Sequence, residues 1–333
     1  MSVETIVLCF PVEPQQVQQI QENCRNRRII VSTQDDIPND ILDADIFCGH
    51  SKKTPIDWAK VVQQGRLKWI QSSAAGLDHC LSDEITESDI VVSGCSGLFA
   101  RQVAEQTAAL AFGLVRRLPT FFRAQQDKCF VRQPTDELQG KNIGIVGLGG
   151  NGQRIAQTLR LFAQTVIATD VFPDSGSELV DELHSPDGLD HLLEQSDIVI
   201  VTLPQTAANE QLIGARQLAA MKQGSYLINV GRGSVVDTFA LTESLATGHL
   251  AGAGLDVCDP EPLPSDSPLW DMENVIITPH VAAQSKTRVP MTIQLFCENL
   301  RRYDERQDLL NLVDKRLGFP RPEYRLRLED IGI

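Results

Sequence analysis

The sequence predicts an α/β protein with two doubly wound parallel sheets. Short apolar runs alternate with helix-like segments along all 333 residues, which is typical of parallel sheets covered by helices on both faces. A chain of this length with 42% hydrophobic residues can bury a large core and favours two domains. A glycine-rich segment that follows one of the apolar runs supports the same fold class.

The first predicted sheet lies in the N-terminal third of the chain. Its five runs have the length and composition of buried strands. We expect the segment that follows them, Val103–Leu118, to form a long connecting helix, because it is rich in Ala and Leu and is ended by Pro119. The five predicted strands are Thr5–Phe10, Arg28–Val31, Asp45–Cys48, Leu67–Gln71 and Ile90–Val92.

A second predicted sheet begins after this helix, and a last helix follows it. The apolar positions of that helix, Met291–Tyr303, need a partner surface, so we expect it to return to the first sheet. This predicts a discontinuous domain, 1–101 with 287–333, and an inserted domain, 102–286. We expect the tail Phe319–Ile333 to lie along the surface or along a partner subunit. The strands of the second sheet are Asn142–Val146, Thr165–Asp170, Ile198–Leu203, Tyr226–Val230, Ala253–Val257 and Val275–Thr278.

The segment Asn142–Ala156 predicts a dinucleotide-binding turn, because a buried strand runs into three spaced glycines and then a helix. Gly147 would permit the tight turn, Gly149 would let the backbone approach a pyrophosphate, and Gly152 would let helix and strand pack closely. The helix N-terminus would face the anion. We therefore predict a Rossmann domain and count Gly150 and Asn151, within the same turn, among the cofactor-binding residues. The alternative is a glycine-rich turn without a ligand.

Asp170 bears on the choice of cofactor. It ends the next predicted strand, where a carboxylate in such folds accepts hydrogen bonds from the ribose hydroxyls. A carboxylate would repel a 2′-phosphate, and the segment Val171–Asp174 has no Arg or Lys to compensate it. The sequence therefore favours NAD over NADP. The alternative is that Asp170 only caps a turn.

Charge and composition exclude several classes of protein. The net charge of −14 argues against nucleic acid and anionic membranes as partners. The eight cysteines form no CxxC pair and no metal-ligand spacing, so we expect reduced and mostly buried thiols. No targeting segment or membrane-length apolar run is present, and we predict a cytoplasmic protein.

Three polar residues follow successive strands of the second sheet. Arg232 follows the strand that ends at Val230, Glu261 follows the one that ends at Val257, and His280 follows Thr278. Ligands of parallel α/β sheets bind beyond the carboxyl ends of the strands, so these residues are candidates for one site.

The three residue types suit hydride transfer between a nicotinamide and a 2-oxo acid. Arg232 could bind the substrate carboxylate and polarise the neighbouring carbonyl group. His280 could supply the proton that joins the carbonyl oxygen, and Glu261 could orient His280 and stabilise its charged form. Each residue taken alone could instead be structural.

Five motifs together resemble those of the D-isomer-specific 2-hydroxyacid dehydrogenases, and the resemblance spans nearly the whole chain. It implies a Rossmann domain inserted into a discontinuous flavodoxin-like substrate domain, a cleft between the two, NAD(P) as hydride carrier, D-stereochemistry and a homodimer. Arg232, Glu261 and His280 match the catalytic positions, and Asp256 matches a residue that holds the nicotinamide carboxamide. The motifs are the glycine turn with Asp170, Leu203–Pro204, Asn229–Gly233 with Val230 and Gly231, Leu255–Pro264, and Thr278–His280.

The resemblance also gives a role to the loop Ser72–Asp78, in which we expect the amides of Ala75 and Gly76 to bind a substrate carboxylate. A simple strand-to-helix turn is the alternative. The chain departs from the family at Gly94, where many relatives carry Asn, and at Asn151, where an apolar residue is commoner.

The lysines Lys52 and Lys53 could meet a phosphate or a second carboxylate of the substrate, although a solvated pair is favoured. We expect His79 to pack or cap rather than catalyse. His184, His191 and His249 are not expected to cluster into a metal site, and no metal is predicted.

The sequence favours an NAD-dependent D-2-hydroxyacid dehydrogenase that reduces a small 2-oxo acid such as glyoxylate or hydroxypyruvate. One alternative is a D-3-phosphoglycerate dehydrogenase. Another is a dinucleotide-sensing scaffold like the transcriptional corepressors of this fold. Oxidation of formate or phosphite is disfavoured, because the additional active-site residues of those relatives cannot be located in the sequence.

Overall fold

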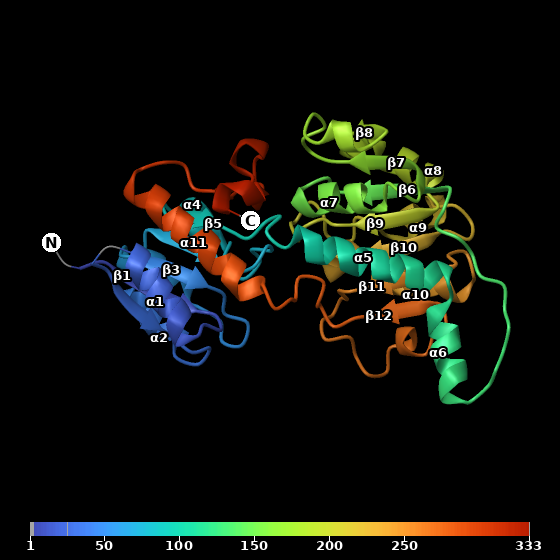
Figure 1. Cartoon of the computed structure of the whole chain (residues 1–333), viewed down its shortest axis with the longest axis horizontal. Helices are drawn as coiled ribbons and strands as arrows, with labels where there is room; N and C mark the ends of the chain where they lie inside the picture. The colour runs from blue at the N-terminus through green and yellow to red at the C-terminus, as the bar shows by residue number, and fades with distance from the viewer. Residues whose placement is uncertain (1–2, 25, 333) are drawn as a thin grey trace. The chain divides into compact units, whose positions relative to one another are not determined.

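A computed structural model describes residues 3–24 and 26–332. The described residues form two compact units, one that ends at Phe99 and resumes at Ser285 and one that is the continuous segment Ala100–Gln284. In Figure 1 the blue N-terminal segment and the red C-terminal segment accordingly belong to the same unit. We refer to this unit as the discontinuous unit and to the other as the inserted unit.

The discontinuous unit contains a parallel sheet with the order β2-β1-β3-β4-β5. This is the flavodoxin-like order, so the predicted fold class is confirmed for this unit. Two apolar clusters form its core. The strands are β1 Thr5–Cys9, β2 Arg28–Val31, β3 Ile46–Gly49, β4 Trp69–Ser72 and β5 Val91–Ser93, and the helices are α1 Pro14–Asn23, α2 Ile37–Asp40, α3 Trp58–Gln64, α4 Asp83–Glu87 and α11 Arg288–Asp304.

The helix α11 packs against this sheet, as the sequence predicts. Phe296 is fully buried, with its ring centroid 5.5 Å from that of Trp69 in β4. Asn299 Nδ2 donates a hydrogen bond to Gln71 Oε1 at 2.9 Å. The tail also lies on this unit, where β14 (Phe319–Pro320) pairs with β13 (Val313–Asp314). The tail up to Gly332 is therefore part of the discontinuous unit.

The inserted unit contains a seven-stranded parallel sheet with the order β12-β11-β10-β9-β6-β7-β8. Six of its strands coincide with predicted runs, and the short edge strand β8 was not predicted. Its strands are β6 Lys141–Val146, β7 Ala163–Thr169, β8 Glu182–His184, β9 Ile198–Val201, β10 Tyr226–Asn229, β11 Gly252–Leu255 and β12 Val275–Ile277. Its helices are α5 Ala100–Val115, α6 Leu118–Gln126, α7 Gly150–Leu159, α8 Leu189–Gln195, α9 Ala215–Ala220 and α10 Thr238–Ala246.

Short 3₁₀ turns connect several of these elements in both units. They are Ile41–Asp43, Ser177–Leu179, Pro186–Gly188, Gly233–Val235, Pro268–Trp270, Pro322–Tyr324 and Leu328–Ile331.

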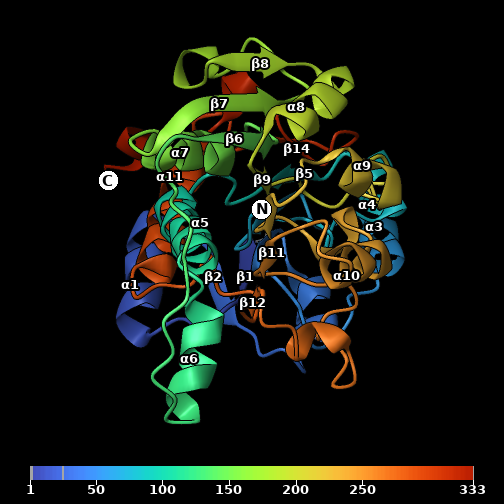
Figure 2. The same ribbon diagram turned by 90° about the vertical axis from the view of Figure 1, so that its right-hand side faces the viewer.

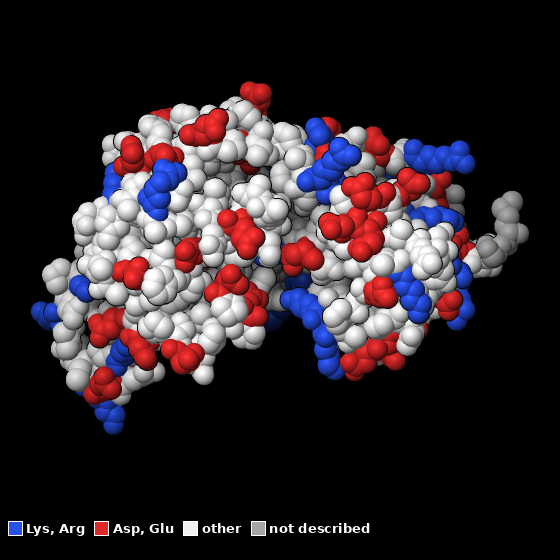
Figure 3. Space-filling model, turned by 180° about the vertical axis from the view of Figure 1, so that it is seen from behind, with Lys and Arg blue, Asp and Glu red and all other residues white. Residues whose placement is uncertain are grey.

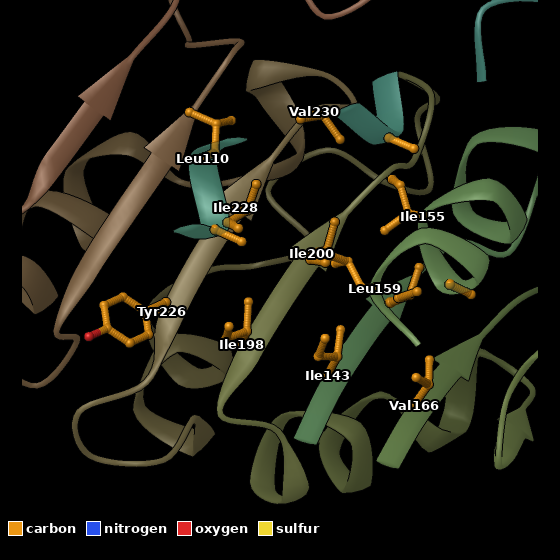
Figure 4. Packing of buried hydrophobic residues seen from close by; sticks show 14 of the residues in the cluster. Leu110, Ile143, Ile155, Leu159, Val166, Ile198, Ile200, Tyr226, Ile228 and Val230 are labelled. Atoms are coloured by element: carbon orange, nitrogen blue, oxygen red, sulfur yellow. The ribbon is translucent and has the colours of Figure 1, made fainter. Parts of the chain in front are cut away.

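The core of the inserted unit consists of side chains from the middle strands and from the helices α5 and α7. Figure 4 shows Ile198 and Ile200 of β9 among Ile143, Ile155 and other apolar residues of this cluster. A second apolar cluster includes Val199 and Val201 of the same strand, whose side chains point to the other face. Burying one such aliphatic side chain contributes roughly 1.5–3 kcal/mol, and these two clusters fix the strand ends that carry the candidate site.

The predicted helix Val103–Leu118 is wrong at its C-terminal end. The helix α5 stops at Val115, Arg117 adopts a left-handed conformation with φ 54°, and α6 begins at Leu118 with Pro119 in its first turn. Proline is tolerated there, because the first amides of a helix have no partner within it. Pro119 therefore belongs to the start of a second helix, which extends beyond the sheet in Figures 1 and 2.

Candidate active site

The glycine turn connects β6 to α7 in the inserted unit. Gly147 has φ +98°, a conformation that side chains other than glycine rarely adopt. A Cβ atom at Gly152 would lie 2.1 Å from the carbonyl oxygen of Gly147, so helix and turn pack as closely as the motif requires. A Cβ atom at Gly149 would meet nothing within 4 Å, which leaves its backbone open to a ligand. The turn therefore fits a dinucleotide pyrophosphate.

Asp170 follows β7 directly and stabilises this turn. Its Oδ2 accepts a hydrogen bond from the amide of Leu148 at 2.7 Å, and its Oδ1 accepts one from the amide of Phe172 at 2.9 Å. The turn-capping role considered as an alternative is thus present. It is compatible with ribose binding, because each carboxylate oxygen can accept a further hydrogen bond.

Leu203 and Gly231 follow β9 and β10 and lie close to the glycine turn. A Cβ atom at Gly147 would be 2.9 Å from Leu203 Cδ2, and one at Gly231 would be 2.5 Å from the carbonyl oxygen of Leu203. Val230, which precedes Gly231, is buried. The carbonyl oxygen of Pro204, which follows Leu203, accepts a hydrogen bond from Asn209 Nδ2 at 3.2 Å. The structure thus brings these predicted cofactor-binding residues to one end of the sheet.

His280 and Glu261 form a hydrogen-bonded pair. The distance from His280 Nδ1 to Glu261 Oε1 is 2.8 Å, and the side chains are 36% and 46% exposed. His280 has a positive φ of 55°, and its amide donates to the carbonyl oxygens of Asp256 and Thr278. With Nδ1 held by the carboxylate, Nε2 is the ring nitrogen that can exchange a proton with a ligand.

Arg232 lies on a loop that contacts the loop of Glu261. A Cβ atom at Gly233 would lie 1.9 Å from the carbonyl oxygen of Cys258, and Thr238 Oγ1 donates to the carbonyl oxygen of Asp259 at 2.7 Å. The Arg232 guanidinium donates to the carbonyl oxygen of Gly231 at 2.9 Å. The two loops that carry Arg232 and Glu261 therefore lie next to each other, as expected for successive strands of a parallel sheet.

Asp256 has a structural role that sequence reasoning missed. The residue is 1% exposed, and its Oδ1 accepts hydrogen bonds from Thr278 Oγ1 at 2.6 Å and from the Val281 amide at 3.0 Å. Its Oδ2 accepts one from the Ala282 amide at 2.8 Å. Asp256 thus fixes both sides of His280. No signal in the sequence marks this role, because it depends on which amides of the turn after Thr278 point inwards.

The loop after β4 in the discontinuous unit contains Ala75 and Gly76. Among the described residues their amides have no hydrogen-bond partner, and both residues are partly exposed. Around this loop, His50 Nδ1 lies 2.6 Å from Ser73 Oγ, and Arg288 Nη2 donates to the carbonyl oxygen of Ser73 at 3.3 Å. The loop therefore offers two amides to an anion, with neighbouring side chains that fix its path.

His50, near this loop, is buried, whereas the lysines that follow β3 are exposed. Burial lowers the pKa of His50 to about 4, and the nearby charges of His79, Lys52 and Arg288 act in the same direction. Lys53 Nζ pairs with Asp35 at 2.8 Å, with both side chains more than two thirds exposed. This agrees with the solvated interpretation of Lys53.

Comparison with known proteins gives a consistent result. Residues 108–282 match the model of the family described as D-isomer specific 2-hydroxyacid dehydrogenase, NAD binding domain. A glyoxylate reductase of Thermofilum pendens is 37% identical over 242 residues, which cover 70% of this chain and 71% of that protein. The chain belongs to the D-isomer specific 2-hydroxyacid dehydrogenase family.

Two further similarities support this assignment. The D-3-phosphoglycerate dehydrogenase of Mycobacterium tuberculosis is 30% identical over 86% of this chain, but the match covers only 54% of that protein. A solved structure of a D-isomer specific 2-hydroxyacid dehydrogenase from Xanthobacter autotrophicus Py2, in complex with NADPH and MES, has a TM-score of 0.79 and 28% identity. It covers 95% of this chain and 100% of that one. The protein is thus an oxidoreductase, a D-2-hydroxyacid dehydrogenase with an NAD-binding domain.

The structure also corrects one expectation about this dehydrogenase. His184 and His191 were not expected to cluster, yet both contact Glu182, at 3.0 and 2.9 Å. They are brought together by the unpredicted strand β8 and by the turn that leads into α8. His249 lies elsewhere, hydrogen-bonded to Gln223 and to the carbonyl oxygen of Leu218.

The remaining composition-based expectations concern thiols and the surface. All eight cysteines are free, five of them are buried, and Cys129 is exposed. Acidic and basic side chains lie interspersed on the face shown in Figure 3. Within the described part of the dehydrogenase, no helix has the length and apolar character needed to cross a membrane.

Proposed function

We propose that this dehydrogenase uses NAD in preference to NADP and reduces a small 2-oxo acid such as glyoxylate or hydroxypyruvate to the D-2-hydroxy acid. The observation that most directly supports the reduction itself is the 2.8 Å contact between Glu261 and His280, whose loop the buried Asp256 fixes. The bound nicotinamide supplies the hydride that reaches the carbonyl carbon.

His280 gives the proton that the carbonyl oxygen acquires. Glu261 holds Nδ1, so the ring presents Nε2 to the substrate and keeps this orientation during proton transfer. In the oxidative direction the neutral ring takes the same proton back.

Arg232 binds the substrate carboxylate and polarises the carbonyl group. Its guanidinium can form two parallel hydrogen bonds with a carboxylate, which fixes orientation as well as affinity. We also assign the amides of Ala75 and Gly76 to the substrate carboxylate, on the basis of their unused donors.

The preference for NAD is carried by Asp170, and Leu203, Pro204, Val230 and Gly231 complete the proposed cofactor site near the glycine turn. The carboxylate of Asp170 is already part of the turn, and a 2′-phosphate beside it would meet a like charge. The relative from Xanthobacter autotrophicus was solved with NADPH, so both coenzymes belong in the test.

The test is oxidation of NADH and NADPH by the purified protein with a panel of 2-oxo acids. We expect turnover with NADH, a large loss of kcat in His280→Ala, and a rise of KM with a loss of kcat/KM in Arg232→Ala. Glu261→Gln should keep the hydrogen bond but reduce kcat. Undiminished turnover in His280→Ala would remove the proposed acid.

A D-3-phosphoglycerate dehydrogenase is the second candidate, favoured by the match over 86% of the chain. In that case 3-phosphohydroxypyruvate should be preferred to hydroxypyruvate, and Lys52→Ala or Lys53→Ala should weaken that preference. We also propose a cytoplasmic homodimer, which sedimentation and fractionation would test.

A further inference from the structure

A cluster of metal-ligating side chains lies at the edge of the sheet of the inserted unit, on residues that the proposed reaction does not use. Glu182 and His184 are two residues apart on β8, so their side chains share one face of the strand. His191 lies in the first turn of α8, which follows the strand after a short turn. The potential ligand atoms of these three residues all lie within 4.8 Å of one another.

The two histidine rings converge on one carboxylate oxygen. Nε2 of His184 lies 3.0 Å from Glu182 Oε2, Nε2 of His191 lies 2.9 Å from the same atom, and the ring centroids are 5.2 Å apart. Ligand atoms around a tetrahedral Zn²⁺ are about 3.3 Å apart, given metal–ligand distances of about 2.0–2.1 Å. Small shifts of these side chains would therefore suffice to surround an ion.

The backbone around the cluster holds it in place. The strand β8 is hydrogen-bonded to β7, with Thr169 opposite His184. A Cβ atom at Gly188 would lie 2.4 Å from Cβ of His184, so the turn that carries α8 packs directly on this histidine. The strand and the helix thus fix the positions from which the ligands project.

The other acidic side chains near the cluster form ion pairs of their own and do not compete for the two histidines. Asp181 pairs with Arg160 and Asp190 pairs with Arg216. The three side chains are 37% to 46% exposed, which gives an ion access and leaves room for a water ligand.

We propose that Glu182, His184 and His191 form a binding site for a divalent transition metal, with Zn²⁺ as the ion that this ligand set favours. Imidazole and carboxylate ligands suit Zn²⁺, and three protein ligands with an open position are a common coordination for it. Each ring gives the lone pair of Nε2 to the metal and carries its proton on Nδ1, so the metal takes the place of the hydrogen bonds to the carboxylate. The site is separate in sequence and in its contacts from the pair Glu261–His280.

The test is a titration of the chelator-treated full-length protein with Zn²⁺ in competition with a chromophoric chelator. We expect one equivalent bound per chain, and a loss of affinity of at least about tenfold in His191→Gln and in His184→Gln. Glu194→Gln removes an exposed carboxylate from the same helix, and His280→Gln removes a second histidine–carboxylate pair, and both should bind as the parent does.

His191 decides the outcome, because its partly exposed side chain can be replaced with little risk to folding, and thermal melts check each variant. Zn²⁺ binding of unchanged affinity in His191→Gln would overturn the proposal, as would a parent protein that takes no Zn²⁺ from the chelator. X-ray absorption at the zinc edge gives an independent readout. Nitrogen and oxygen ligands near 2.0 Å are expected, whereas sulfur near 2.3 Å would place the ion on the cysteines instead.

Discussion

Replacing Asp256 by alanine should destabilise the inserted unit and displace His280. The carboxylate accepts three hydrogen bonds at 2.6, 3.0 and 2.8 Å in a position that is 1% exposed. Hydrogen bonds to a charged group contribute roughly 1.5–3 kcal/mol each. The Thr278 hydroxyl can turn to another acceptor, and removing a buried charge recovers part of its desolvation cost. The amides of Val281 and Ala282, one part-buried and one buried, lose their acceptor, so we expect a net loss of about 3 kcal/mol.

This loss corresponds to a fall in melting temperature of roughly 6–12 °C for a unit of this size. Scanning calorimetry of the full chain would measure it, since separate units can melt in separate transitions. The melting temperature of Asp256→Asn should lie between those of the parent and the alanine variant. Its side-chain amide keeps one acceptor oxygen but turns an N–H group towards the amide of Ala282. Asp266→Asn, at an exposed position in the same segment, is the matched control.

The same variant should lose kcat more than affinity for the coenzyme, because the His280 loop depends on Asp256 whereas the glycine turn does not. The reasoning would be refuted by an Asp256→Ala protein that melts within about 1 °C of the parent, or by one that turns over at the parent rate. Either result would mean that the hydrogen bonds to this carboxylate do not set the position of the loop.

Three further outcomes are expected. Gly152→Val should abolish NADH binding in a fluorescence titration while the fold measured by circular dichroism persists, because its Cβ would lie 2.1 Å from the carbonyl oxygen of Gly147; tight binding would contradict the role of the turn. Ile200→Ala, in the centre of the core and 0% exposed, should lower the free energy of unfolding by about 3 kcal/mol in urea, and Ile200→Val by about 1 kcal/mol, so equal effects would argue against close packing. The pKa of His50 is lowered to about 4 in the folded chain. As the pH falls, the unfolded chain takes up a proton on this histidine near its ordinary pKa of about 6.5, whereas the folded chain takes it up only near pH 4. Stability should therefore be complete above pH 6.5 and decrease as the pH falls from 6.5 to 4, and His50→Gln should remove part of this decrease; an unchanged slope would contradict it.

The sequence predicted most of the strands because each is a short, almost wholly apolar run. Ile198–Val201, for example, is four buried aliphatic residues between polar segments. The edge strand β8 escaped prediction because its three residues, Glu182, Leu183 and His184, are only partly buried and give no apolar run. A strand held mainly by pairing to β7 leaves little trace in hydrophobicity.

The candidate site was likewise predicted only in part. The positions of Glu261 and His280 after successive strands predicted their proximity, because parallel strands end on one edge of the sheet. The role of Asp256 in fixing the His280 loop could not be predicted, since it depends on which amides a turn of several residues points inwards. The cluster of His184 and His191 depended in turn on β8, and so was lost with that strand. Pro119 was misinterpreted because a proline that stops one helix and a proline that starts the next give the same local pattern.

Because the inserted unit interrupts the other unit, the position of a truncation decides which unit stays complete. Residues 100–284 form a single stretch of coding sequence whose sheet and core are complete in themselves. The discontinuous unit has no such stretch: a stop codon before Arg288 would remove Phe296 and expose the face of Trp69 that it covers. A truncated product of that kind would keep the complete sheet of the inserted unit but would have an incomplete core in the discontinuous unit.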